Sequence, residues 1–323
     1  MPMMISLPLV ELVIIFLLIV VIIRLLKLRG VFNDSHQGVF DRLVTELALP
    51  AVIFSGMATI SFRPDWIFPA LIILASLIIC ILIVYGICLA LHLPARTTGT
   101  LIMVGTFGST STFAVPLLVD IFGYGSEALA EGITMATLGV ALPFFTIGVL
   151  IADYFGRKEE NAGHSKLATL KDFLSTPIFI AFVLGIIASI LTSHYKVPGS
   201  IVFMEIFTGF FEVIKHSVDL LVWIAIGLML KPVKLKKFIP LLALVVLVKM
   251  LLQPALALLL TNAAGLPVLT RDIILIESAM PSGAIAAVLA DRYGCDGPLA
   301  AALVIATYLI SLVTIPALLY FMG

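Results

Sequence analysis

Long apolar segments alternate with short polar ones along the whole chain. A helix needs about 20 predominantly apolar residues to cross the hydrocarbon core of a bilayer. By that criterion the pattern predicts ten transmembrane helices, at residues 5–27, 43–62, 67–92, 98–122, 127–152, 172–193, 200–230, 237–261, 270–292 and 297–322. The predicted fold is therefore an all-α membrane protein that crosses the bilayer many times.

Composition supports this class and excludes others. Hydrophobic residues make up 62% of the chain and charged residues only 12%, whereas soluble domains are roughly half apolar and one quarter charged. A net charge of zero, without a run of Lys or Arg, argues against nucleic acid as a partner. The first apolar run lacks a basic leading region, so we interpret it as the first transmembrane helix and not as a cleavable signal peptide. The lipid bilayer is the one partner that composition alone predicts.

The positions of the basic residues predict how the chain is oriented across the membrane. Most Lys and Arg residues lie in the loops after the first, third, fifth, seventh and ninth spans, whereas the alternate loops contain only Arg63, Lys196 and Arg271. Basic loops stay on the cytoplasmic side. We therefore expect a multi-pass protein of the plasma (inner) membrane with both termini outside. The longest polar connection, residues 154–171, is expected to be a solvated cytoplasmic linker.

An internal repeat divides the chain. When the sequence is aligned with itself at a shift of 171 residues, identical residues coincide at several positions: Pro69 with Pro240, Ser111 with Ser282, Asp120 with Asp291, and Gly123 with Gly294. The predicted halves are residues 1–153 and 172–323, with five spans each. Because five is an odd number, the second half must enter the bilayer inverted relative to the first. Inverted repeats are typical of secondary transporters, whose sites form near the midplane from discontinuous helices.

Two aligned segments contain residues that are unfavourable in a transmembrane helix. ESAMPSGAIA (277–286) in span nine aligns with TFGSTSTFAV (106–115) in span four. We expect both helices to break, near residues 108–112 and 280–283, and to cross. Their free N–H groups would favour an anion. The predicted substrate-binding residues are Ser109, Thr110, Ser111, Thr112, Pro281, Ser282 and Gly283. The alternative is a pair of kinked helices packed through small residues.

Charged residues inside spans are costly and mark functional candidates. Glu277 precedes the second predicted break by one turn, so its carboxylate and the freed carbonyls could hold Na⁺, or the carboxylate could carry H⁺. The alternative is that Glu277 is a structural partner for a lysine. Lys249 could pair with Asp219 or Glu277, or contact an anionic substrate. No other cofactor is expected.

Several motifs resemble the auxin efflux carrier family over nearly the whole chain. They are LALPAVIFSGMA (47–58), VPLLVDIFGYG (115–125) and ESAMPSGAIAAVLADRYGCDGPLAAALVIATYLISLVTIPAL (277–318). The resemblance implies a scaffold of spans 1, 2, 6 and 7 and a mobile transport domain of spans 3–5 and 8–10, which move as an elevator. Ser109 stands where the family commonly has Asn. The Glu277 pattern is similar to that of the related bile-acid sodium symporters, whose Glu belongs to a sodium site.

The function predicted is secondary active transport of small organic anions (carboxylates), coupled to Na⁺ or H⁺ or uncoupled. The alternative is an anion channel or a membrane-embedded sensor on the same fold. A homodimer through the scaffold helices is a further expectation. The chain has no metalloprotease motif and no nucleophile–base pair at membrane depth, so we do not expect an enzyme.

Overall fold

The computed structural model describes residues 2–58, 63–157, 174–194, 201–232 and 235–322, and the regular structure in these ranges is helical, as predicted. Most of the predicted linker 154–171 lies outside the described residues. The α-helices are α1 (Pro2–Leu28), α2 (Asp34–Arg42), α3 (Leu49–Ala58), α4 (Pro64–Ala90), α5 (Ala95–Thr106), α6 (Val115–Phe122), α7 (Glu127–Met135), α8 (Val149–Arg157), α10 (Pro177–His194), α11 (Ile201–Met229), α12 (Leu235–Val246), α13 (Gln253–Ala263), α14 (Val268–Ala279), α15 (Ala284–Arg292) and α16 (Gly297–Met322).

Short π-helical segments join several of these helices into longer ones. They are η1 (Leu43–Ala48), η2 (Thr110–Ala114), η3 (Ala136–Ala141), η4 (Phe144–Gly148) and η5 (Leu247–Leu252). Four of them end two residues before a proline, namely Pro50, Pro116, Pro143 and Pro254. A proline ring clashes with the carbonyl four residues earlier and removes one donor. The wider π turn accommodates the ring, so the helix continues through the proline instead of ending there.

The apolar helices support a multi-pass membrane protein. Within the described ranges, five helical stretches are long and apolar enough to cross a bilayer: Leu9–Leu28, Pro64–Ala90, Glu127–Arg157, Lys236–Ala263 and Gly297–Met322. Thr110–Phe122, Pro177–Ser189 and Ser217–Met229 are shorter apolar helices. The count of ten spans, the inverted repeat and the orientation of the termini stay predictions.

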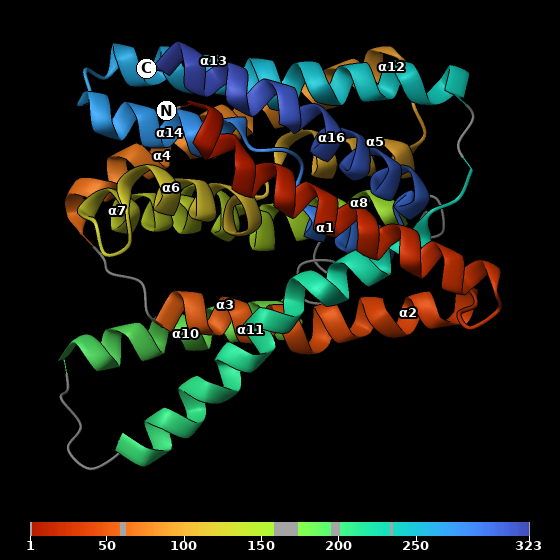
Figure 1. Ribbon diagram of the computed structural model, residues 1–323, viewed down its shortest axis with the longest axis horizontal. Coiled ribbons are helices and arrows are strands. Elements are labelled where there is room, and N and C mark those ends of the chain that lie inside the picture. Colours follow the sequence, from red (N-terminus) through yellow and green to blue (C-terminus); the bar gives the residue numbers. More distant parts are fainter. Residues whose placement is uncertain (1, 59–62, 158–173, 195–200, 233–234, 323) are drawn as a thin grey trace.

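Helices α2, α3, α10 and α11 lie together on one side of the molecule, while α4 to α8 and α12 to α16 lie on the other (Figure 1). Helix α1 contacts α11 on the first side and α16 on the second. Glycines allow close approach between helices: a Cβ on Gly185 of α10 would lie 2.6 Å from Met57 of α3, and one on Gly227 of α11 would lie 2.9 Å from Ile23 of α1. Small residues have this role in membrane helix packing.

Candidate functional site at the helix crossover

Two helices are interrupted, and their interruptions meet. The chain is extended at Phe107 after α5 and at Met280 after α14. The backbone N–H of Ser109 donates to the Pro281 carbonyl at 2.8 Å, and that of Gly283 donates to the Phe107 carbonyl at 3.0 Å. Backbone groups inside a bilayer must be satisfied within the protein. The two breaks satisfy one another in this way, and they are the crossing of discontinuous helices that the polar segments predict.

The first break is shorter than the predicted range 108–112. Helix α5 ends at Thr106 and the π-helical segment η2 already begins at Thr110. The Ser109 carbonyl accepts from the backbone N–H of Phe113 at 3.2 Å, so it starts a wide turn ahead of Pro116. The chain is therefore non-helical from Phe107 to Ser109 and resumes as a π-helix at Thr110, so the observed break covers the first part of the predicted range.

Lys249 places its ammonium group at the crossover. Its side chain is 1% exposed, and Nζ donates to the Gln253 Oε1 at 2.7 Å and to the Ser278 carbonyl at 2.8 Å. Ser278 lies in the last turn of α14, where the helix dipole is negative. The ammonium therefore neutralises the carboxyl end of a broken helix. Its two hydrogen bonds go to a carbonyl and an amide, and it forms no direct ion pair with Glu277 or Asp219 among the described residues.

Gly108 leaves the space that this ammonium group needs. A Cβ at Gly108 would lie 3.0 Å from both Cε and Nζ of Lys249. We expect Gly108→Ala to displace the ammonium and to lower the free energy of unfolding by about 1–3 kcal/mol, measured by thermal melting in detergent. Gly105→Ala is the matched control, because its Cβ would lie 3.7 Å or more from any neighbour. Equal melting temperatures for the two variants would contradict the prediction.

Glu277 is buried without a partner. Its side chain is 1% exposed, and neither carboxylate oxygen has a hydrogen-bond partner among the described residues. Lys249 acts on it electrostatically but not by contact. An isolated buried carboxylate is strongly unfavourable. The site therefore fits a group that arrives from outside, either a proton or a monovalent cation.

Na⁺ would need ligands besides the Glu277 carboxylate, because hard cations take several oxygen ligands. The Ser278 carbonyl accepts from Lys249 and has a second lone pair that could serve as such a ligand. A proton would need no further ligand.

Some of the other predicted site residues hydrogen-bond to neighbouring helices, and one is exposed. Ser282 is fully buried, and its hydroxyl donates to the Val104 carbonyl at 2.6 Å, so it holds the two broken helices together. Thr112 donates to the Asp219 carboxylate at 3.0 Å and so connects η2 to α11. Ser111 is exposed, which leaves its hydroxyl accessible to a ligand.

An aromatic cluster beside the crossover was not predicted. Tyr308 of α16 packs against Phe16 of α1 and Phe113 of η2, each with ring centroids 4.6 Å apart, and Phe16 also packs against Trp223 of α11. The Trp223 indole N–H is buried, and it has no hydrogen-bond partner in the part of the chain that the structure describes. Aromatic residues inside apolar spans give no distinctive pattern, so only the packing shows that they gather here.

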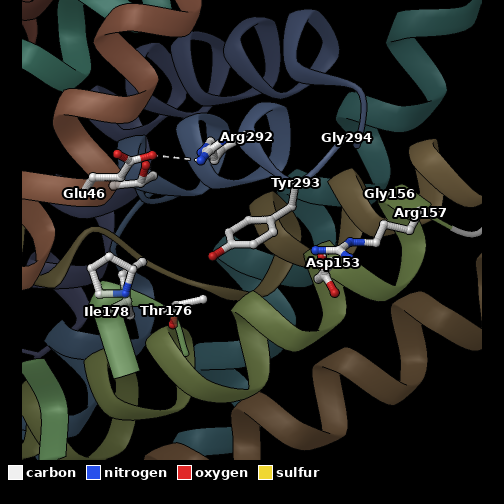
Figure 2. Close-up of a pocket in the computed structure, with 11 residues that line it drawn as sticks. Glu46, Asp153, Gly156, Arg157, Thr176, Ile178, Arg292, Tyr293 and Gly294 are labelled. Atoms are coloured by element: carbon white, nitrogen blue, oxygen red, sulfur yellow. Dashed lines mark hydrogen bonds and ion pairs between the residues drawn. The ribbon is translucent and has the colours of Figure 1, made fainter. Parts of the chain in front are cut away.

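A separate cavity of about 430 Å³ lies away from the crossover, between η1, α8, α15 and the start of α10. Figure 2 shows Arg292 paired with Glu46 across it and Arg157 beside Asp153, while the Tyr293 ring extends toward Thr176. The predicted scaffold and transport helices both line this space. No sequence pattern pointed to it, because its lining comes from four distant segments.

Comparison with known proteins gives the family. Residues 8–319 match the family described as "Membrane transport protein". A transporter of Methanocaldococcus jannaschii, described as uncharacterized, is 24% identical over 312 residues, which are 94% of this chain and 96% of that protein. A second, from Methanothermobacter thermautotrophicus, is 24% identical over 308 residues, with 95% and 96% covered. The resemblance seen in the motifs is thus confirmed: the chain belongs to the auxin efflux carrier-like family of membrane transport proteins.

Proposed function

We propose that this transporter carries small organic anions, with carboxylates as the substrate class, by secondary active transport. The observation that carries the proposal is the crossover of two broken helices with the Lys249 ammonium beside it. A buried cation next to a run of hydroxyl side chains suits a carboxylate better than a cationic or neutral substrate. Ser109, Thr110 and Ser111 would contact the anion, with Pro281 and Gly283 shaping the opposite wall.

The charges near the crossover favour coupling to a cation. Lys249 contributes one positive charge, while Glu277 and Asp219 are acidic. With both acids ionised, the surroundings would repel an anion. A proton or Na⁺ at Glu277 removes one negative charge, so cation and anion would each raise the affinity of the other by the same factor. Either H⁺ or Na⁺ would serve as this cation.

We further propose elevator-like movement. The transport domain would comprise α4 to α8 and α12 to α16, and the scaffold α1 to α3, α10 and α11, in two inverted repeats with ten spans. The grouping in Figure 1 supports this division. The hydrogen bond between Thr112 and Asp219 and the cavity in Figure 2 then lie between the two units. A homodimer through the scaffold helices is part of the same proposal.

Proteoliposomes test the function directly. We expect labelled malate, malonate or a larger carboxylate to enter vesicles with saturable kinetics and to show counterflow. Flux that does not saturate would instead indicate the channel alternative. If no carboxylate in a broad panel is transported or raises the melting temperature, the proposed substrate class is wrong.

Ser111→Trp should block transport in a folded protein. Ser111 is the exposed residue of the predicted hydroxyl run, so an indole there would fill the space for substrate. We expect at least a tenfold fall in uptake, which corresponds to about 1.4 kcal/mol. Leu82→Trp, at an exposed position of α4, is the control. Unchanged uptake in Ser111→Trp would place the substrate elsewhere.

A further inference from the structure

A buried hydrogen-bond donor on α11 lacks an acceptor. The Trp223 side chain is 7% exposed, and its indole N–H has no hydrogen-bond partner within the described ranges. Buried tryptophans usually pair this N–H, because a buried donor without an acceptor loses the hydrogen bond that it would make to water. One explanation for such a group is a partner that is bound only during part of the functional cycle.

The neighbouring ring does not replace that acceptor. Phe16 of α1 contacts Trp223 with ring centroids 5.6 Å apart and an angle of 70° between the planes. A ring face is a much weaker acceptor for an N–H than a carbonyl or carboxylate oxygen. The contact with Phe16 therefore packs the apolar part of the indole and leaves most of the donor capacity of its N–H unused.

Trp223 lies beside the predicted substrate site. One turn earlier on α11, Asp219 accepts a hydrogen bond from Thr112 of η2 at 3.0 Å. Side chains one turn apart lie on the same face of a helix. The indole is therefore on the face of α11 that is turned toward the hydroxyl run of the predicted site.

A series of aromatic contacts leads to the same place. Phe16 also packs against Tyr308 of α16, with ring centroids 4.6 Å apart. The Tyr308 hydroxyl donates to the Ser109 hydroxyl at 3.5 Å. Trp223 is thus connected to both ends of the hydroxyl run, at Thr112 through the neighbouring turn of α11 and at Ser109 through two rings.

We propose that the Trp223 indole N–H is the hydrogen-bond donor with which the scaffold holds the substrate carboxylate. The inference rests on the carboxylate transport proposed above. An indole N–H can only donate and a carboxylate can only accept, so the two groups are complementary. Trp223 would hold the anion from the scaffold, while the Lys249 ammonium attracts it from the transport domain. Because the indole is buried, the substrate reaches it only when the surrounding rings or the two units move apart, as alternating access requires.

The chain has two tryptophans, Trp66 and Trp223, so the N–H can be replaced at one position alone. In a Trp66→Phe background, a tryptophan auxotroph can incorporate benzothienylalanine, which has sulfur in place of the indole N–H, or fluorotryptophan, which keeps the N–H. We expect the dissociation constant of a transported carboxylate to rise about tenfold in the benzothienyl form, which corresponds to about 1.4 kcal/mol. The fluorinated form should bind like the tryptophan form.

Melting temperatures separate this role from a structural one. The benzothienyl form removes a donor that has no acceptor in the ligand-free protein, so it should melt no lower than the tryptophan form. The matched control is Trp223→Phe with the same exchange at Trp66, whose ring lies 4.5 Å from the Arg63 guanidinium. That exchange should not change the dissociation constant.

The outcomes separate this inference from the proposed function. Equal dissociation constants for the tryptophan and benzothienyl forms would overturn the role of Trp223 and leave carboxylate transport standing. A lower melting temperature with unchanged affinity would also overturn it, because the N–H would then have a structural partner. If the unmodified protein neither binds nor transports any carboxylate, the proposed function fails and this inference fails with it. If the Trp66→Phe background does not fold, the same criteria apply to Trp223→Phe compared with the wild type.

Discussion

Glu277→Gln is expected to fold normally but to bind substrate with an affinity that no longer depends on Na⁺ or pH. The glutamine keeps the shape of the side chain, and it removes the carboxylate that would take up the cation or proton. Coupling between two sites is typically about 1–3 kcal/mol, which is about 5–150-fold in affinity. The measurement is the dissociation constant of a transported carboxylate in Na⁺ and in choline, from mildly acidic to mildly alkaline pH.

Glu131→Gln is the matched control for this experiment. Glu131 is also a buried glutamate, but its carboxylate accepts a hydrogen bond from Thr270 at 2.8 Å and so has a partner. We expect it to keep the wild-type dependence. If the wild-type affinity is itself indifferent to both Na⁺ and pH, Glu277 has no coupling role and is a structural partner of Lys249.

Lys249→Met is expected to weaken substrate binding strongly. Methionine fills a similar volume but leaves the Ser278 carbonyl and the Gln253 Oε1 without their donor, and it removes the positive charge beside the site. The affinity change comes from the lost charge, because removing one member of a buried charge pair between protein and ligand costs about 2–5 kcal/mol. Each 1.4 kcal/mol is about tenfold in affinity. The dissociation constant of the carboxylate should therefore rise by about 30-fold or more.

A double variant separates two roles of Lys249. If the lysine serves only to balance Glu277, then Lys249→Met combined with Glu277→Gln should recover most of the binding. If it attracts the anion, the double variant should bind as poorly as Lys249→Met. Size-exclusion profiles and melting temperatures show which variants fold. Near-wild-type binding by folded Lys249→Met would refute a role for this ammonium in recognition.

The chain sequence by itself determined the class of protein and the place of the breaks. Long apolar segments can only become helices in a bilayer, because no water is present to satisfy the backbone. Pro281 cannot donate to a helical carbonyl, and glycine at positions 108 and 283 is unfavourable inside a helix, so the interruptions follow from local chemistry. The family motifs lie in these same segments, which is why the family was identifiable as well.

Only the tertiary structure decided which polar groups meet. Lys249 had several acidic candidates, yet it donates to the Ser278 carbonyl, and Glu277 has no hydrogen bond within the described ranges. Ser282 looked free for substrate and instead bonds to Val104, 178 residues away. Periodicity specifies the face of a helix on which a side chain lies, but the partner depends on how that helix is rotated and crossed against helices from elsewhere in the chain.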